Sequence, residues 1–107
     1  MGLFDMSTKR MTLSRGIELA QSTPHAVLLD VRTVEEFEQG HLPGSVNLPV
    51  NRIQSIAFDK QIPLFVYCQS GMRSGRACSY LQQAGYTATN IGGLAGYQGT
   101  LESGRTT

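Results

Sequence analysis

The sequence predicts one α/β domain, with a central, mostly parallel sheet of five strands and helices on both faces. Three observations support this prediction. The chain has 107 residues, which is enough for one hydrophobic core but not for two. Residues 27–32 and 64–67 are short, mainly apolar runs of the kind that form buried strands. Apolar residues at helical spacing alternate with such runs, which is typical of a parallel sheet covered by helices.

The predicted strands are short and mainly apolar. In chain order they span residues 11–13, 27–32, 45–48, 64–67 and 87–91. The first is expected at an edge of the sheet. Pro49 closes the third, because proline cannot donate a hydrogen bond to a neighbouring strand. The fourth consists of four apolar residues and should be buried on both faces.

Helix signals separate these strands. Ser14 is the expected cap of a helix that ends before Thr23, and Thr33 with Glu36 has the spacing of a capping box for a helix ending near Gly40. Apolar residues at helical spacing predict two more helices, one at residues 50–58 and one that runs from the loop at residue 68 to Gly85.

Composition and the chain ends limit the classes of function. Residues 1–10 are expected to be a mobile extension without a signal peptide, residues 11–97 the folded domain, and residues 98–107 a polar, frayed tail. The formal net charge of +1 gives no general attraction to nucleic acid or to a membrane. Two cysteines do not make a disulfide framework, so we expect a reducing, cytoplasmic environment.

Cys68 lies in the predicted loop between the end of a strand and the start of a helix, where α/β proteins place their sites. The free N–H groups of a helix N-terminus stabilise a thiolate, which is the nucleophilic form of cysteine. Ser70 and Gly71 suit a loop whose N–H groups point inward. Arg73 and Arg76 lie near the start of the helix, where cations oppose its dipole, so we expect a bound anion to offset them.

Residues 68–74 read Cys-Gln-Ser-Gly-Met-Arg-Ser and resemble the active-site loop of the rhodanese sulfurtransferases. Residues 30–44 resemble the second signature of that family, and the similarity extends over about residues 11–97. The family usually has a short helix with an aromatic residue after a double glycine, so the resemblance implies such a helix at residues 94–97, with Tyr97 as the aromatic. The resemblance implies that Cys68 carries a persulfide stabilised by Arg73. It also implies that the outer sulfur is cradled by backbone N–H groups of the loop, formed by Gln69, Ser70, Gly71, Met72 and Ser74.

The length of the loop separates two chemistries found on this fold. Related phosphatases and arsenate reductases have one more residue between cysteine and arginine, and a histidine commonly precedes their cysteine. Here four residues separate Cys68 from Arg73, and Tyr67 precedes the cysteine. Both differences favour a sulfur substrate over a tetrahedral oxyanion.

Polar residues of the second signature are candidates for supporting roles. Asp30 is expected to pair with Arg73 or with Arg32 and so to fix the loop. Arg32 either pairs with Asp30 or approaches an anionic substrate. For His41 we favour a structural role over that of a general base, because sulfur transfer from a thiolate needs no base.

The other chemically reactive residues are given structural roles. Cys78 is expected to be a packed helix residue rather than a resolving cysteine. Glu35 and Glu36 are expected to complement the dipole of their own helix. No group of cysteines and histidines has the spacing of a metal site.

These features and the resemblance imply a sulfurtransferase that acts by double displacement. Cys68 would take a sulfane sulfur from an anionic donor such as thiosulfate and pass it to cyanide, a thiol, thioredoxin or another protein. No metal or organic cofactor is implied. Two alternatives stay open: a rhodanese-fold binding module without turnover, and a cysteine-dependent phosphatase or arsenate reductase.

Overall fold

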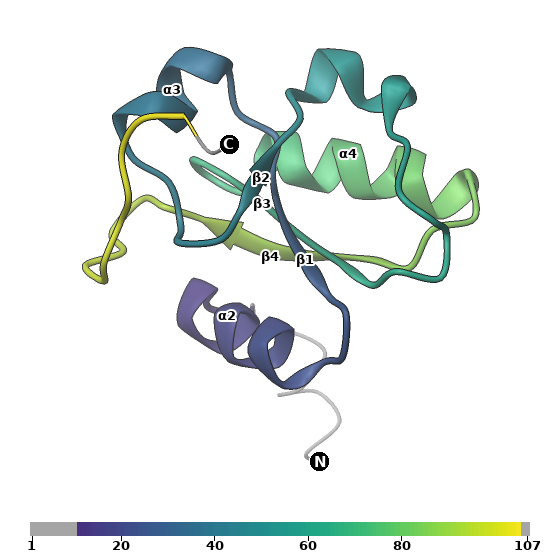
Figure 1. The fold of residues 1–107 in the computed structure, drawn as a ribbon, viewed down its shortest axis with the longest axis horizontal. Coiled ribbons are helices and arrows are strands. Elements are labelled where there is room, and N and C mark those ends of the chain that lie inside the picture. The colour runs from purple at the N-terminus through teal and green to yellow at the C-terminus, as the bar shows by residue number, and fades with distance from the viewer. Residues whose placement is uncertain (1–10, 106–107) are drawn as a thin grey trace.

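The strand that ends at Cys68 lies inside a four-stranded parallel sheet (Figure 1). In the computed structural model, which describes residues 11–105, the strands follow the order β2-β1-β3-β4 and all pair in parallel. Their bounds are β1 Val27–Asp30, β2 Val46–Asn47, β3 Leu64–Cys68 and β4 Ala88–Gly93. The α/β class and the parallel sheet are confirmed, but the described residues form four strands rather than five.

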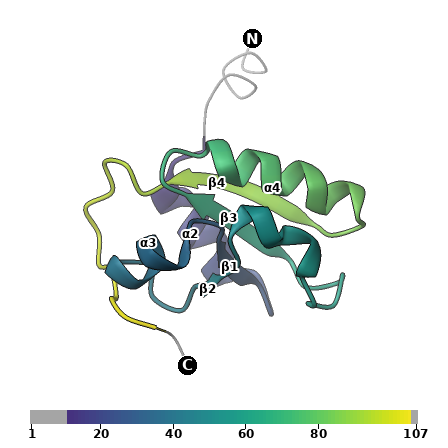
Figure 2. The same cartoon turned by 90° about the horizontal axis from the view of Figure 1, so that it is seen from above.

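Helices cover both faces of this sheet, as predicted. Figures 1 and 2 show α2 on one face and α4 on the other. The helices are α2 Leu13–Ser22, α3 Val34–Gln39, the 3₁₀ helix η1 Val50–Ser55, and α4 Met72–Gln83. No helix within residues 11–105 is long and apolar enough to cross a membrane.

Alternation along β3 divides the hydrophobic core into two parts. Leu64, Val66 and Cys68 face α4 and η1, whereas Phe65 and Tyr67 face α2. All five residues are buried, because each side of the strand is covered by a helix. The strand is therefore packed on both faces, and its last residue, Cys68, lies at the carboxyl edge of the sheet.

The predicted edge strand at residues 11–13 is wrong, and so is the predicted cap at Ser14. Thr12 is the N-cap of α2, since its hydroxyl accepts a hydrogen bond from the Arg15 N–H over 3.1 Å. Leu13 is consequently the first residue of the helix, and it is buried against the sheet. The segment thus covers a face of the sheet and does not extend its edge.

Of two other predicted helices, one is shorter than expected and one does not form. Within residues 50–58 only η1 forms, and it is broken at Arg52, whose φ of −122° is not helical. No helix forms at residues 94–97, because the N–H groups of Leu94 and Ala95 donate to the carbonyls of Cys68 and Gln69 over 3.0 and 2.9 Å. This turn is thereby attached to the loop that follows β3.

Residues 102–105 contact α3 and His41, whereas we expected residues 98–107 to be a frayed tail. His41 and Glu102 exchange two backbone hydrogen bonds of 2.8 Å, and the Gly104 N–H donates to the Glu38 carbonyl over 2.6 Å. Arg105 also forms an ion pair with the Glu38 carboxylate. These pairings join residues far apart in sequence. The predicted mobile extension at residues 1–10 lies outside the described residues.

Candidate active site

The candidate site begins where β3 ends. Cys68 is the last residue of that strand, and α4 begins four positions later, with Gly71 as its N-cap. Gly71 has a φ of +95°, a left-handed conformation that glycine adopts without strain. The loop therefore turns back over the cysteine, which has no exposed surface.

Three donors converge on the sulfur of Cys68. The Gly71 N–H lies 3.0 Å from Sγ, and the N–H and hydroxyl of Ser74 each lie 3.4 Å from it. Burial of the thiol opposes its ionisation, but hydrogen bonds from Ser74, Gly71 and Ser70 outweigh it and lower the pKa of Cys68. The arrangement stabilises the thiolate at the position predicted from the sequence.

Gln69 and Met72 form no hydrogen bond with Sγ in this structure, and the cradling of the outer sulfur of a persulfide by the N–H groups of the loop stays a prediction. The Met72 N–H donates to the Ser70 hydroxyl over 3.4 Å, and the Met72 side chain is 76% exposed. The Gln69 side chain is also exposed. Both face the surroundings of the loop rather than the sulfur itself.

Arg73 forms a bidentate ion pair with Glu36 of α3. Its two terminal nitrogens lie 2.7 and 3.0 Å from the two carboxylate oxygens. This hydrogen bonding raises the pKa of Arg73 and lowers the pKa of Glu36 to about 2. The alternative in which Asp30 pairs with Arg73 is therefore not found. The pairing fixes the guanidinium near the loop with a full bidentate geometry.

Asp30 and Arg32 form a second, buried ion pair. The Arg32 Nη2 lies 2.8 Å from one Asp30 oxygen, and the Arg32 backbone N–H donates to the other oxygen over 2.8 Å. Arg32 also donates to the Gly40 carbonyl over 2.6 Å. Of the two roles predicted for Arg32, the pairing with Asp30 is the one formed here. This pair fixes the chain where it leaves β1.

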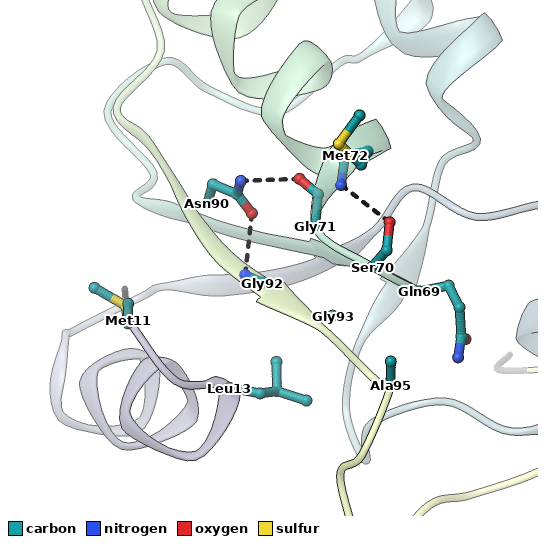
Figure 3. Close-up of a pocket in the computed structure, with 10 residues that line it drawn as sticks. All are labelled: Met11, Leu13, Gln69, Ser70, Gly71, Met72, Asn90, Gly92, Gly93 and Ala95. Carbon is teal, nitrogen blue, oxygen red and sulfur yellow. Dashed lines mark hydrogen bonds between the residues drawn. The ribbon is translucent and has the colours of Figure 1, made fainter. Parts of the chain in front are cut away.

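Two hollows open beside the loop. The first, of about 450 Å³, is bounded by residues 69–72, the end of β4, Met11 and Leu13, and no charged side chain lines it (Figure 3). The second, of about 330 Å³, includes Arg32 and Glu36 in its lining. Gln69 lines both hollows, but Cys68 lines neither. In this structure, Cys68 is fully buried beneath the loop.

The comparison with known families agrees with this geometry. The family model described as the rhodanese-like domain matches residues 16–100. This chain belongs to the rhodanese-like domain family. The structure of this rhodanese-like domain also superposes on the crystal structure of a rhodanese-like domain protein from Staphylococcus aureus. The TM-score is 0.78 at 27% identity, covering 92% of this chain and 100% of that one.

The relatives in sequence include proteins whose names describe a reaction. The thiosulfate sulfurtransferase PspE of Escherichia coli is 39% identical over 71 residues, covering 62% of this chain and 68% of the relative. The thiosulfate:glutathione sulfurtransferase of Saccharomyces cerevisiae is 32% identical over 83 residues, covering 64% of this chain and 60% of the relative. This rhodanese-like domain thus matches about two-thirds of each.

Three side chains near the site of this rhodanese-like domain were missed by sequence reasoning. Glu36 was predicted only to cap its own helix and to complement the helix dipole, although it also binds Arg73. Asn90 contacts Ser74 and Gly71, and its only signal is a polar residue two positions before a double glycine. The Tyr67 hydroxyl accepts from the Leu42 N–H over 3.0 Å, which no local pattern indicates.

Other candidates lie away from the sulfur. Arg76 is exposed on α4 and lines neither hollow. His41 is buried, stacks on Phe37 and bonds the Phe37 carbonyl through Nδ1 over 2.7 Å, as expected of a structural residue. Cys78 is buried in the core, which raises the pKa of its thiol to about 12. Within residues 11–105, no three metal-binding side chains form a cluster.

Proposed function

We propose that this protein is a sulfurtransferase that carries a sulfane sulfur as a persulfide on Cys68. The observation that carries the proposal is the ring of donors from Gly71 and Ser74 at 3.0–3.4 Å from Sγ. Such donors favour the thiolate, which is the form that attacks sulfur. The relatives named as thiosulfate sulfurtransferases support the same class of reaction.

The first half-reaction loads the enzyme. The Cys68 thiolate attacks the outer, sulfane sulfur of an anionic donor such as thiosulfate, and a new S–S bond forms. The S–S bond of the donor breaks, and sulfite leaves with the bonding electron pair. The proton of the thiol has already been lost, so no general base is needed. His41, which is buried and held by Phe37, has no part in this step.

The second half-reaction unloads it. A nucleophilic acceptor, such as cyanide, a thiolate or the cysteine of a partner protein like thioredoxin, attacks the outer sulfur of the persulfide. The persulfide bond breaks, and its electron pair returns to Sγ as the thiolate. The donors around Sγ stabilise the departing thiolate in this step. Neither half-reaction requires a metal or an organic cofactor.

Two guanidinium groups near the loop, each paired with one carboxylate, support an anionic donor. Arg32 lines the second hollow, and Arg73 is held beside it by Glu36. We assign Arg73 to stabilising the donor and the persulfide, and Arg32 with Asp30 to fixing the wall of the hollow. Arg76 is exposed and is assigned only to long-range attraction of anions. Two free cysteines fit a reducing, cytoplasmic environment.

The test is steady-state turnover with thiosulfate and cyanide, followed as thiocyanate release. Activity that is lost in Cys68→Ser supports the proposal. Arg73→Ala is expected to lower kcat/KM about 10- to 100-fold, the effect of losing a charged hydrogen bond. Arg15→Ala is the control, since Arg15 is an exposed surface residue paired with Glu18 on α2. An Arg73→Ala rate equal to that of the control would remove Arg73 from the site.

The same preparation separates the alternatives. A phosphatase would hydrolyse an aryl phosphate in a reaction that depends on Cys68, and the short loop argues against this. A binding module would show no turnover with any sulfur donor and a partner interaction unchanged by Cys68→Ser. The donors around Sγ argue against a binding module, because a scaffold has no need to stabilise a thiolate.

A further inference from the structure

The hydroxyl of Ser74 has more acceptors than it has protons. Its oxygen lies 2.7 Å from the Asn90 Oδ1, 3.4 Å from the Cys68 Sγ and 3.5 Å from the Gly92 carbonyl oxygen. A serine hydroxyl carries a single proton and so donates fully to one acceptor at a time. By distance, the amide of Asn90 is the favoured acceptor, and Cys68 receives the weaker interaction.

Asn90 is held in place for this contact. Its Nδ2 donates to the Gly71 carbonyl over 3.1 Å, and its Oδ1 accepts from the Gly92 N–H over 3.0 Å, as Figure 3 shows. The register of β4 shifts here, because Asn90 pairs with Val66 whereas Gly92 pairs with the next residue of β3. The extra residue interrupts the ladder between β3 and β4. Bulges of this kind redirect side chains beside functional sites.

We infer that Asn90 is a positioning residue that competes with Cys68 for the single proton of Ser74 and thereby sets the fraction of Cys68 present as thiolate. In the thiol state, the Ser74 proton points to Asn90, and the Ser74 oxygen is free to accept from the S–H. In the thiolate state, the hydroxyl turns to Sγ and the bond to Asn90 is lost. Ionising Cys68 therefore costs one hydrogen bond to Asn90.

The competition has a chemical consequence for sulfur transfer. Once the inner sulfur is bonded to a second sulfur, it is neutral and a poorer acceptor than a thiolate, so the hydroxyl returns to Asn90. When an acceptor removes the sulfur, Sγ becomes an anion again and draws the proton back. The Ser74 hydroxyl thus moves with each half-reaction. The inference about the resting thiol does not depend on this and holds whether or not the protein transfers sulfur.

The other titratable groups around the Cys68 thiol are the same residues in every variant considered. The charged ones are Arg73 of α4 with Glu36 of α3, and the Asp30–Arg32 pair at the end of β1. Burial raises the pKa values of Tyr67 on β3 and Cys78 on α4, so both stay neutral in the range of interest. β4 has no titratable side chain between Ala88 and Gly93, and the ion pair of α2, Arg15 with Glu18, is exposed on the surface.

The test is a double-mutant cycle read as the pKa of Cys68. Asn90→Leu is made in the normal protein and in Ser74→Ala, and the ¹³Cβ signal of labelled cysteine is followed against pH. Replacing Asn90 also removes its bond to Gly71, but that loss occurs in both backgrounds and cancels in the difference. The Cys78 signal from the same samples shows whether the core has changed.

We expect Asn90→Leu to lower the pKa of Cys68 by roughly 0.5–1 unit more when Ser74 is present than in Ser74→Ala, the scale of one neutral hydrogen bond. Thr89→Val, at the neighbouring position of β4, is the control and should show no such difference. Equal shifts in the two backgrounds, or a difference of opposite sign, would overturn the inference. If the leucine variant fails to fold, Asn90→Ala gives the same comparison.

Discussion

The guanidinium of Arg73 donates to both carboxylate oxygens of Glu36, over 2.7 and 3.0 Å, although the two residues are 37 positions apart. Glu36 also closes the capping box of α3, since it accepts from the Thr33 N–H over 3.0 Å. One carboxylate therefore fixes the start of α3 and the arginine of the loop. The position of the Arg73 guanidinium beside the loop therefore depends on the correct placement of α3.

This pair predicts an acid-dependent loss of stability. The hydrogen bond from Arg73 lowers the pKa of Glu36 from 4.5 to about 2 in the folded protein. A lowered native pKa stabilises the fold above pH 4.5, and this contribution disappears as the pH falls towards 2. Because the two side chains are 32% and 34% exposed, we expect only about 1 kcal/mol.

Glu36→Gln tests it, because glutamine keeps an acceptor for the Thr33 N–H but has no charge to titrate. The free energy of unfolding, measured with urea between pH 3 and pH 6, should fall less steeply with decreasing pH in this variant than in the normal protein. Glu35→Gln is the control, since Glu35 is exposed on the same helix. The same fall in the free energy of unfolding with decreasing pH in all three proteins would contradict the prediction.

Gly93→Ala should disrupt the loop around Cys68. A Cβ at this position would overlap the Gln69 carbonyl group and the Ser70 nitrogen, which are backbone atoms that cannot swing aside. We expect the loop to be displaced, the pKa of Cys68 to rise, and sulfur loading to fall at least about 10-fold as the donors of the loop move. The rate of loading by thiosulfate measures this.

Gly44→Ala is the matched control for that variant. A Cβ there meets nothing within 4 Å, and its cost is the strain of a residue at a φ of +80°. It should lower stability by about 1 kcal/mol and leave sulfur loading unchanged. Normal loading by Gly93→Ala would show that the close approach of β4 to the loop is not needed.

The contrast between local and distant contacts explains what could be predicted. The placement of Cys68 after a buried strand and before a helix follows from residues adjacent in sequence, and it was predicted correctly. The pairing of Arg73 with Glu36 depends on where α3 lies relative to α4. Glu36 had a sufficient local explanation at the start of α3, and the anion expected beside Arg73 was taken to be a bound one. Sequence reasoning therefore gave Glu36 a role that is correct but incomplete.

Two errors in the fold have a similar origin. Thr12 and Ser14 are both good capping residues, and the burial of Leu13 against the sheet decides between them. The C-terminal segment looks polar and unstructured, yet Glu102 pairs with His41 through the backbone, which no side-chain pattern records. Such contacts are set by tertiary packing and leave no periodic signal in the chain.

Tyr67→Phe should destabilise the fold without affecting sulfur transfer. The Tyr67 hydroxyl is fully buried, accepts from the Leu42 N–H and lies 2.9 Å from the Ser45 Oγ. Removing it leaves a buried N–H without a partner, which costs about 1–3 kcal/mol. The free energy of unfolding in urea measures this cost.

Tyr86→Phe is the comparison for that change. The Tyr86 hydroxyl donates to the Phe58 carbonyl in a part-buried contact, where water can replace it. Its loss should cost less than that of the Tyr67 hydroxyl. Equal costs, or a fall in sulfur loading by Tyr67→Phe, would mean that Tyr67 acts on the site rather than on the core.

Cys78→Ala should leave sulfur loading intact. Cys78 packs in the core beside Leu81 of α4, and its thiol stays protonated because burial raises its pKa to about 12. We expect a loss of about 1–2 kcal/mol in stability from the small cavity, with the normal yield of persulfide. A variant that loads but cannot release its sulfur would instead identify Cys78 as a resolving cysteine.

The most direct test of the central claim is the intact mass of the reduced protein before thiosulfate, after thiosulfate, and after a further treatment with cyanide. Cys68→Ser is carried through the same steps. The account predicts a gain of one sulfur atom that cyanide removes and that Cys68→Ser never shows. No gain in the fully reduced protein, or an equal gain in Cys68→Ser, would contradict persulfide chemistry at Cys68.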